Sequence, residues 1–509
     1  METLLSGDQA LWWDAPLKLK VLRSRGIRVV HEIHSVDQFS RSAVPVSSPR
    51  VVKEYALPGG QRSFWSSAMK TSLFLGRVLV GQEEIAPYVG LKGLARDLGV
   101  DGGKFSEDFF SADTFGVVVP NGERIIEGIG FDELQDRFKH LRGIVHQNLK
   151  ETLVDSKVDA DKWNHLFGLT RHIPSGSGLD VSVSCLWASA LKIFVEAGVD
   201  SGIEITTSFD NFPRFISAAR GLLAIFREDY ARVAGLYNQA AATIGMAQLD
   251  TDKLELPYFS VGKDAWGRYE WTRQTIFLAD LSKLDGGAVV IPKAIPVLIE
   301  ILMRGPTVMP DHGSVYSSAS ARFLEDLKGI GHNLICHPVW RVRFSALDRL
   351  ADTAIVFRLP EYLRWYFGTE VISGLEFSRE WRKAADDSRE KLETLKAARG
   401  NTLCDLLVKD GYLDKETVDR LLFLKGKIVS NSTRSGAADL DIITAEVKCL
   451  ETRILARKLR RAVELIQVAK SLHYWNLRPY YWWIVLLDPS GSWERSIVEG
   501  AEIYQEELQ

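Results

Sequence analysis

One segment of the sequence has the composition of a phosphate-binding loop. It places two serines and two glycines ahead of an apolar run that begins at Val181: Ser175, Gly176, Ser177 and Gly178. Glycines before a helix leave backbone N–H groups free to face an anion, and the positive end of the helix dipole attracts the same charge. A simple turn also explains the segment, because Ser177 or Asp180 can cap the helix by accepting a hydrogen bond from its first turn.

The same segment resembles parts of two enzyme families. Residues 176–194 resemble the aspartate-bearing segment of the galactokinase and mevalonate kinase superfamily, and this resemblance implies that Asp180 is the catalytic base. Ser175 and Gly176 before a helix are similar to one motif of viral RNA polymerases. The sequence lacks the Gly-Leu-Gly-Ser-Ser loop of those kinases, the Gly-Asp-Asp motif of those polymerases and the lysine of a Walker loop. A phosphotransfer or nucleotide-using enzyme with its glycine-rich loop at 174–180 is therefore an alternative function.

The histidines and cysteines do not predict a metal centre. His332, Cys336 and His337 are close in sequence, but a closed zinc site takes four ligands that usually arrive as two paired short spacings. His31 and His34 fall on a predicted strand, where a spacing of three places them on opposite faces. We expect no metal ion and no other cofactor.

A basic cluster lies on a helix predicted over residues 439–472. Its members are Arg453, Arg457, Lys458 and Arg461. Three of the arginines recur at steps of four, which places them on one helix face that could follow a phosphate backbone. RNA as a weak partner, and a nucleic-acid-associated binding protein, form the second alternative function. Glutamates flank the cluster, so a helix that faces solvent or another protein is the simpler interpretation.

Large aromatic side chains gather at both ends of the chain. They are Trp12, Trp13, Trp475, Tyr480, Tyr481, Trp482 and Trp483. Large rings contribute most to packing and to protein interfaces. These residues therefore predict either closure over the chain's own core or an aromatic-rich interface with a second copy.

The composition restricts the class of protein. The chain has 509 residues, 46% of them hydrophobic, and a formal net charge of −3. This balance disfavours a strongly basic nucleic-acid binder and an acidic disordered protein. Four scattered cysteines fit a reducing compartment. We find no secretory signal and no apolar run of the roughly 20 residues that a bilayer helix needs, so we expect an intracellular protein, cytoplasmic or within a virion, with no membrane partner.

The hydrophobic patterns predict an α+β fold that is predominantly α-helical. A mixed α/β region covers residues 1–150 and contains a β-hairpin that turns at Asn121–Gly122, since this dipeptide favours the positive φ angles of a tight turn. Residues 151–375 form a mainly helical region with an aromatic strand or loop insertion near 254–277, and residues 376–509 form a helical region with an aromatic-rich end. The predicted helices cover 181–197, 213–246, 293–303, 316–328, 376–399, 402–425 with a turn at 410–411, and 439–472.

These observations favour a non-enzymatic structural protein. The sequence holds no complete catalytic set, is close to neutral and ends in aromatic-rich segments. In general character it is similar to the coat proteins of double-stranded RNA viruses, which are likewise rich in helices and poor in motifs. We expect self-assembly into a homo-oligomer, with the chain itself as the main partner and a viral capsid as a candidate assembly.

Overall fold

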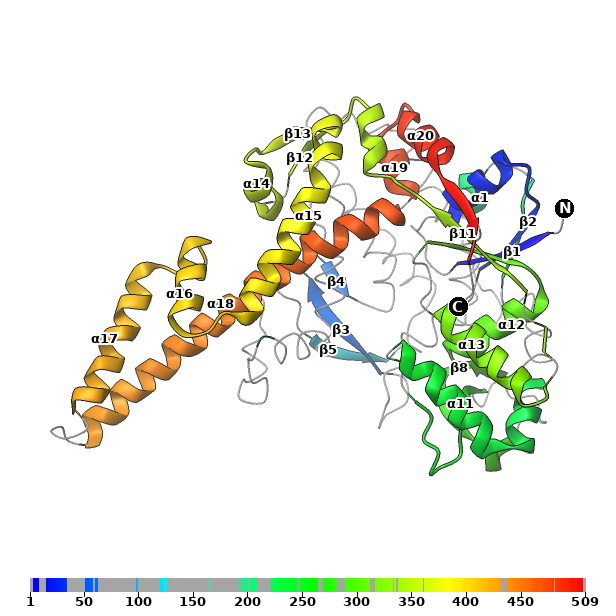
Figure 1. Cartoon of the computed structure of the whole chain (residues 1–509), viewed down its shortest axis with the longest axis horizontal. Coiled ribbons are helices and arrows are strands. Elements are labelled where there is room, and N and C mark those ends of the chain that lie inside the picture. The colour runs from blue at the N-terminus through cyan, green and yellow to red at the C-terminus, as the bar shows by residue number, and fades with distance from the viewer. Residues whose placement is uncertain are drawn as a thin grey trace.

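The chain is mixed α/β and predominantly helical, as the sequence predicts. A computed structural model shows an α/β body from which helices of the last third of the chain project as an arm (Figure 1). The residues that it describes are 3–8, 15–33, 51–57, 60–62, 98, 120–125, 164, 192, 195–199, 202–207, 221–244, 246, 248–263, 269–281, 289–311, 316–332, 334–335, 337–359, 361–431, 437–479 and 481–506.

A six-stranded sheet forms the centre of the body, with the strand order β14-β11-β10-β1-β2-β6. Its strands are β1 (Leu4–Asp8), β2 (Val29–Ile33), β6 (Glu204–Thr207), β10 (Thr307–Pro310), β11 (Val339–Arg343) and β14 (Glu502–Gln505). All neighbours are parallel except β14, which pairs antiparallel with β11. One sheet therefore draws strands from all three of the regions that the hydrophobic patterns delimit.

Helices cover both faces of this sheet (Figure 1). On one face lie α1 (Ala15–Ser24), α19 (Tyr481–Leu487) and α20 (Ser492–Gly500); on the other lie α12 (Ala294–Arg304) and α13 (Tyr316–Gly329). The placement of helices on both faces follows from the handedness of the connections between parallel strands. The chain passes from β1 through α1 to β2 in one direction, and from β10 through α13 to β11 in the opposite direction. Because such crossovers are right-handed, their helices must pack on opposite faces.

The α13 side of the body contains a second apolar core. It joins residues 221–228, which are helical, α11 (Tyr230–Thr243), α12 and α13 to a small antiparallel sheet with the order β8-β7-β9. The strands are β7 (Glu255–Lys263), β8 (Tyr269–Phe277) and β9 (Val289–Pro292). The aromatic segment near 254–277 is thus a pair of strands. Phe226, Tyr237 and Phe323 form its aromatic centre, and the Tyr237 and Phe323 ring centroids are 5.6 Å apart in an edge-to-face arrangement.

The predicted β-hairpin at Asn121–Gly122 is wrong. Both residues lie inside the strand β5 (Pro120–Ile125), which pairs antiparallel with β3 (Val51–Leu57), Gly122 opposite Glu54. The strand that follows β3 is β4 (Gly60–Arg62), and it pairs with the other side of β3. The preference of Asn-Gly for tight turns is local, and here pairing with a strand distant in sequence overrides it.

The last third of the chain is mainly helical. After η6 (Asp348–Asp352), β12 (Val356–Arg358), α14 (Glu361–Phe367) and β13 (Val371–Ser373) come α15 (Gly374–Ala397), α16 (Gly400–Lys409), α17 (Lys415–Asn431) and α18 (Ala437–Leu477). Ser373 and Glu376 form a capping box at the start of α15. Gly411 ends α16 with a φ of 75°, which confirms the predicted turn there. None of the helices in the described part of the chain is long and apolar enough to cross a membrane.

The buried aromatic centre yields a stability prediction. Tyr237 is fully buried, and its hydroxyl group has no hydrogen-bond partner among the residues that the structure describes. We expect Tyr237→Phe to raise the free energy of unfolding by about 1–2 kcal/mol, because it removes a buried unpaired hydroxyl. Urea unfolding measures the difference.

Tyr230→Phe is the matched control for this substitution. The Tyr230 hydroxyl donates a hydrogen bond of 2.8 Å to the carbonyl oxygen of Glu255, so its loss should lower the free energy of unfolding by about 1 kcal/mol. Destabilisation of similar size by both substitutions would contradict the prediction.

Candidate functional site

The candidate site is the carboxyl edge of the sheet, the side on which the parallel strands have their C-terminal ends. Strands β1 and β10 are neighbours, with Ser6 opposite Val308, so Asp8 and Pro310 end their strands at the same edge. The connections that leave these two strands run to opposite faces of the sheet. At such a reversal of strand order the outgoing segments separate and leave a crevice outside the carboxyl ends.

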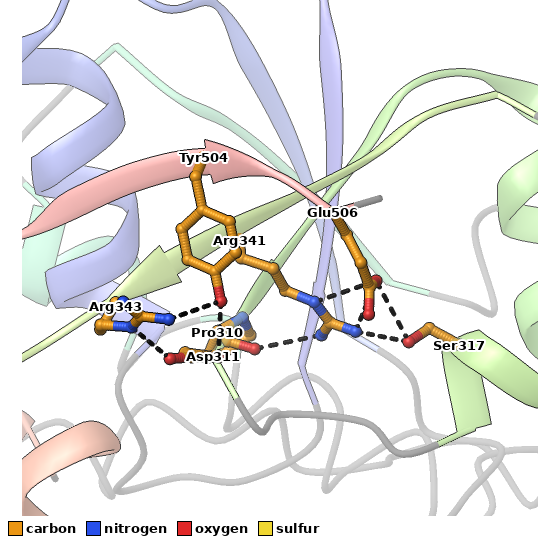
Figure 2. Close-up of polar contacts among 7 residues, drawn as sticks. All are labelled: Pro310, Asp311, Ser317, Arg341, Arg343, Tyr504 and Glu506. Atoms are coloured by element: carbon orange, nitrogen blue, oxygen red, sulfur yellow. Dashed lines mark hydrogen bonds and ion pairs between the residues drawn. The ribbon is translucent and has the colours of Figure 1, made fainter. Parts of the chain in front are cut away.

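A hydrogen-bonded cluster fixes an acidic side chain at this edge (Figure 2). Asp311 directly follows β10, and its backbone N–H donates to the carbonyl oxygen of Val342 at 2.7 Å. The Tyr504 hydroxyl donates to Oδ1 of Asp311 at 2.8 Å, and Nε of Arg343 donates to Oδ2 at 2.6 Å. The carboxylate is therefore held from two strands, β11 and β14.

The cluster also sets the protonation of its members. The hydrogen bond to Asp311 is the main reason why the pKa of the Arg343 guanidinium lies above its usual value. Burial, followed by the hydrogen bond to Asp311, raises the pKa of Tyr504. The arginine therefore stays charged and the tyrosine stays a neutral donor across the physiological pH range.

Arg341 lies beside this cluster and is buried (Figure 2). Its Nε and NH2 donate to Oε2 of Glu506 at 3.1 and 2.8 Å, and its NH1 donates to the carbonyl oxygen of Pro310 at 3.2 Å. The same guanidinium contacts the Ser317 hydroxyl in the first turn of α13. A buried charge is tolerated only with partners of this kind, so Arg341 ties four elements together.

Arg343 differs from Arg341 in its access to solvent. Its side chain is 47% exposed, against 10% for the side chain of its partner Asp311. It lies over the ring of Tyr504, 4.8 Å from the centroid, and 3.4 Å from the carboxylate of Glu502. The edge thus presents one partly exposed guanidinium, which the buried Asp311 carboxylate holds in place.

The predicted phosphate loop and its associated base are outside the described residues. These are Ser175, Gly176, Ser177, Gly178 and Asp180. The cluster at the sheet edge uses none of them. Among the described residues, no group of three or more histidines, cysteines, aspartates and glutamates could hold a metal ion. His31 is buried, with its Nδ1 2.9 Å from the hydroxyl oxygen of Ser6 on the neighbouring strand.

The predicted basic face on α18 is wrong as an exposed surface. Lys458 is fully buried, and its Nζ donates to the carbonyl oxygens of Leu98 and Ala398, both at 3.0 Å. Arg461 is also buried; its Nε donates to Asp410 at 2.9 Å and its NH1 to the Tyr412 hydroxyl at 3.2 Å. Of the four basic residues, only Arg453 and Arg457 keep substantial solvent access.

Of the two roles predicted for the aromatic residues, the structure shows closure over the chain's own core for Tyr481. Tyr481 is buried within its own chain, and its hydroxyl accepts a hydrogen bond of 2.9 Å from Nζ of Lys20 in α1. A Cβ added to Gly198 would lie 2.8 Å from the Tyr481 ring, so the packing there requires glycine. Trp12, Trp13 and Tyr480 are outside the described residues. Trp475 lies in α18, and Trp482 and Trp483 lie in α19; their side chains are outside the description.

The sequence contained a signal for the edge cluster that motif analysis missed. Arg341 and Arg343 alternate with apolar residues in β11, and Tyr504 and Glu506 show the same spacing at the end of the chain. Residues two apart on a strand point to the same face. Asp311 and Tyr504 are 193 positions apart, however, so only strand pairing could bring them together.

The chain matches no known family model, no curated protein and no solved structure. Its function is therefore inferred from its own residues and topology.

The environment of Lys458 predicts a pH dependence. Burial lowers the pKa of this lysine from 10.5 to about 8. Between these two values the unfolded chain keeps a proton that the folded chain has lost, so stability rises with pH in that range. Relative to Lys458→Met, the wild-type chain should gain up to about 1.4 kcal/mol per pH unit between about pH 8 and 10.

Urea unfolding of both chains at several pH values tests this. Lys448→Met, which removes an exposed lysine from the same helix, is the control and should show no such trend. A stability difference between wild type and Lys458→Met that stays constant from pH 7 to 10 would contradict the lowered pKa.

Proposed function

We propose that the carboxyl edge of the parallel sheet binds a nucleotide or another phosphorylated small molecule. The observation that carries this proposal is the reversal of strand order between β1 and β10. Crossovers on opposite faces leave a crevice there, and open parallel sheets bind their ligands in such crevices. The proposal concerns binding alone.

The Arg343 guanidinium, which Asp311 and Glu502 partly neutralise, is the group at the edge that would contact an anionic ligand. The Arg343 guanidinium is partly exposed and stays protonated, and the N-terminus of α13 adds positive potential from the same side. Asp311 is buried, and its hydrogen bonds with Arg343 and Tyr504 fix the position of the guanidinium that a phosphate would contact.

This site differs from the phosphate loop that the sequence predicts. The nucleotide-using function suggested by residues 174–180 is retained, but its binding residues are placed on β10, β11 and α13. The rigid sheet holds Asp311 and Arg343 before any ligand arrives, so binding would not have to order them.

Thermal unfolding with ATP, GTP, ADP or NAD, each with and without Mg²⁺, tests the proposal. A ligand at a hundred times its dissociation constant stabilises the native state by about 2.7 kcal/mol, so at least one compound should raise Tm. We expect Arg343→Gln to weaken binding about tenfold or more, because hydrogen bonds to charged groups contribute roughly 1.5–3 kcal/mol.

Arg364→Gln is the matched control. Arg364 in α14 has a similarly exposed side chain, at 44%, and pairs with Glu370. Each variant is compared with its own ligand-free Tm, so a change in intrinsic stability does not affect the result. The proposal fails if no compound raises the Tm of the wild-type chain, or if both arginine variants respond to the ligand alike.

A further inference from the structure

The structure assigns a self-association surface to the projecting arm. The sequence predicts self-assembly through its aromatic ends, but Tyr481 packs inside its own chain. We infer instead that the distal arm, defined as α17 and residues 437–453 of α18, pairs with the distal arm of a second copy. This inference is independent of ligand binding at the sheet edge.

The distal arm exposes an unusual number of large apolar side chains. They are Leu422, Phe423, Val429 and Ile442, with exposed fractions of 46, 54, 78 and 67%. Leu422 and Val429 are seven residues apart and so lie on one face of α17. Val429 and Ile442 flank the connection between the two helices, which places both near the tip. Of the other exposed large apolar residues of the described chain, Val356, Val371 and Leu375 lie together in β12, β13 and the start of α15, but each is at most 40% exposed.

These apolar side chains are not all equally accessible to a second molecule. The cationic ends of Arg420 and Lys427 lie over the Phe423 ring, 5.9 and 4.7 Å from its centroid, and shield it. Leu422, Val429 and Ile442 are aliphatic and are 46, 78 and 67% exposed. These three therefore form the apolar part of the surface.

The charges of the distal arm favour a second copy over nucleic acid or an anionic membrane. Between Lys415 and Arg453 the sequence has seven basic and six acidic residues. They are segregated: α17 from Arg420 onward contains basic residues and no acidic ones, while residues 437–447 of α18 contain acidic residues and no basic ones.

This segregation makes the arm complementary to itself. Within one chain Arg420 and Lys425 of α17 already pair with Glu446 and Glu451 of α18. The basic α17 of one copy can pair in the same way with the acidic part of α18 of a second copy when a two-fold axis places these two helices against each other. Lys427 and Asp441 are exposed and have no ionic partner within the described part of the chain, so both can pair across such an axis.

The shape of the molecule permits this pairing. The arm extends away from the body, and its tip is far from the sheet and its covering helices (Figure 1). Two arms can therefore lie side by side while the two bodies remain apart. A chain that does not self-associate is the outcome that would exclude this pairing.

Sedimentation equilibrium and light scattering on the full chain test the inference. We expect a dimer of twice 57.1 kDa with a dissociation constant in the micromolar range or tighter. Leu422→Glu and Val429→Glu should each weaken dimerisation about tenfold or more, because each places two unpaired carboxylates in the interface. Both side chains are exposed, so circular dichroism and Tm of the monomer should not change.

Ile335→Glu is the matched control, since Ile335 is 66% exposed but lies on the body. It should leave the dissociation constant unchanged. A wild-type chain that is monomeric at all concentrations overturns the inference. A dimer that both arm variants leave intact, or that Ile335→Glu weakens to the same extent, also overturns it, because the interface would then lie elsewhere.

Discussion

The handedness of parallel strand connections is the constraint on which the body depends. β1 is one of the two central strands; from it the sheet extends through β2 on one side and through β10 and β11 on the other. Because each crossover must be right-handed, α1 and α13 are forced onto opposite faces of the sheet. The reversal of strand order between β1 and β10 is a consequence of this handedness.

In this protein the buried charged side chains mainly hold neighbouring elements in place. Arg341 joins β10, β11, α13 and the end of the chain, and its partner Glu506 directly follows the last strand. Lys458 and Arg461 do the same in the helical part, where backbone carbonyls and Asp410 hold them. Removing one member of such a set leaves the other buried and unpaired, which costs more than an exposed ion pair contributes. Partial exposure is what distinguishes Arg343 as a candidate ligand contact.

Body and arm present two different surfaces. The edge of the sheet is polar, preformed and supported by strands, which suits a small charged ligand. The distal arm is convex, has apolar side chains near its tip and carries charges of both signs, which suits another helix pair. A chain that combined the two would bind a small molecule on each body and associate through its arms.

Local patterns in the sequence were sufficient for most helices. α12, α13 and α18, and the turn at Gly411, follow from periodicity and from residues whose conformational preferences act within a few positions. The cluster of Asp311, Arg343 and Tyr504, the pairing of β5 with β3 and the burial of Lys458 were decided only by the tertiary structure. A helix makes its hydrogen bonds with its own residues, whereas a strand or a buried charge obtains partners from distant segments. Those partners are set by topology, which residue spacing along the chain does not encode.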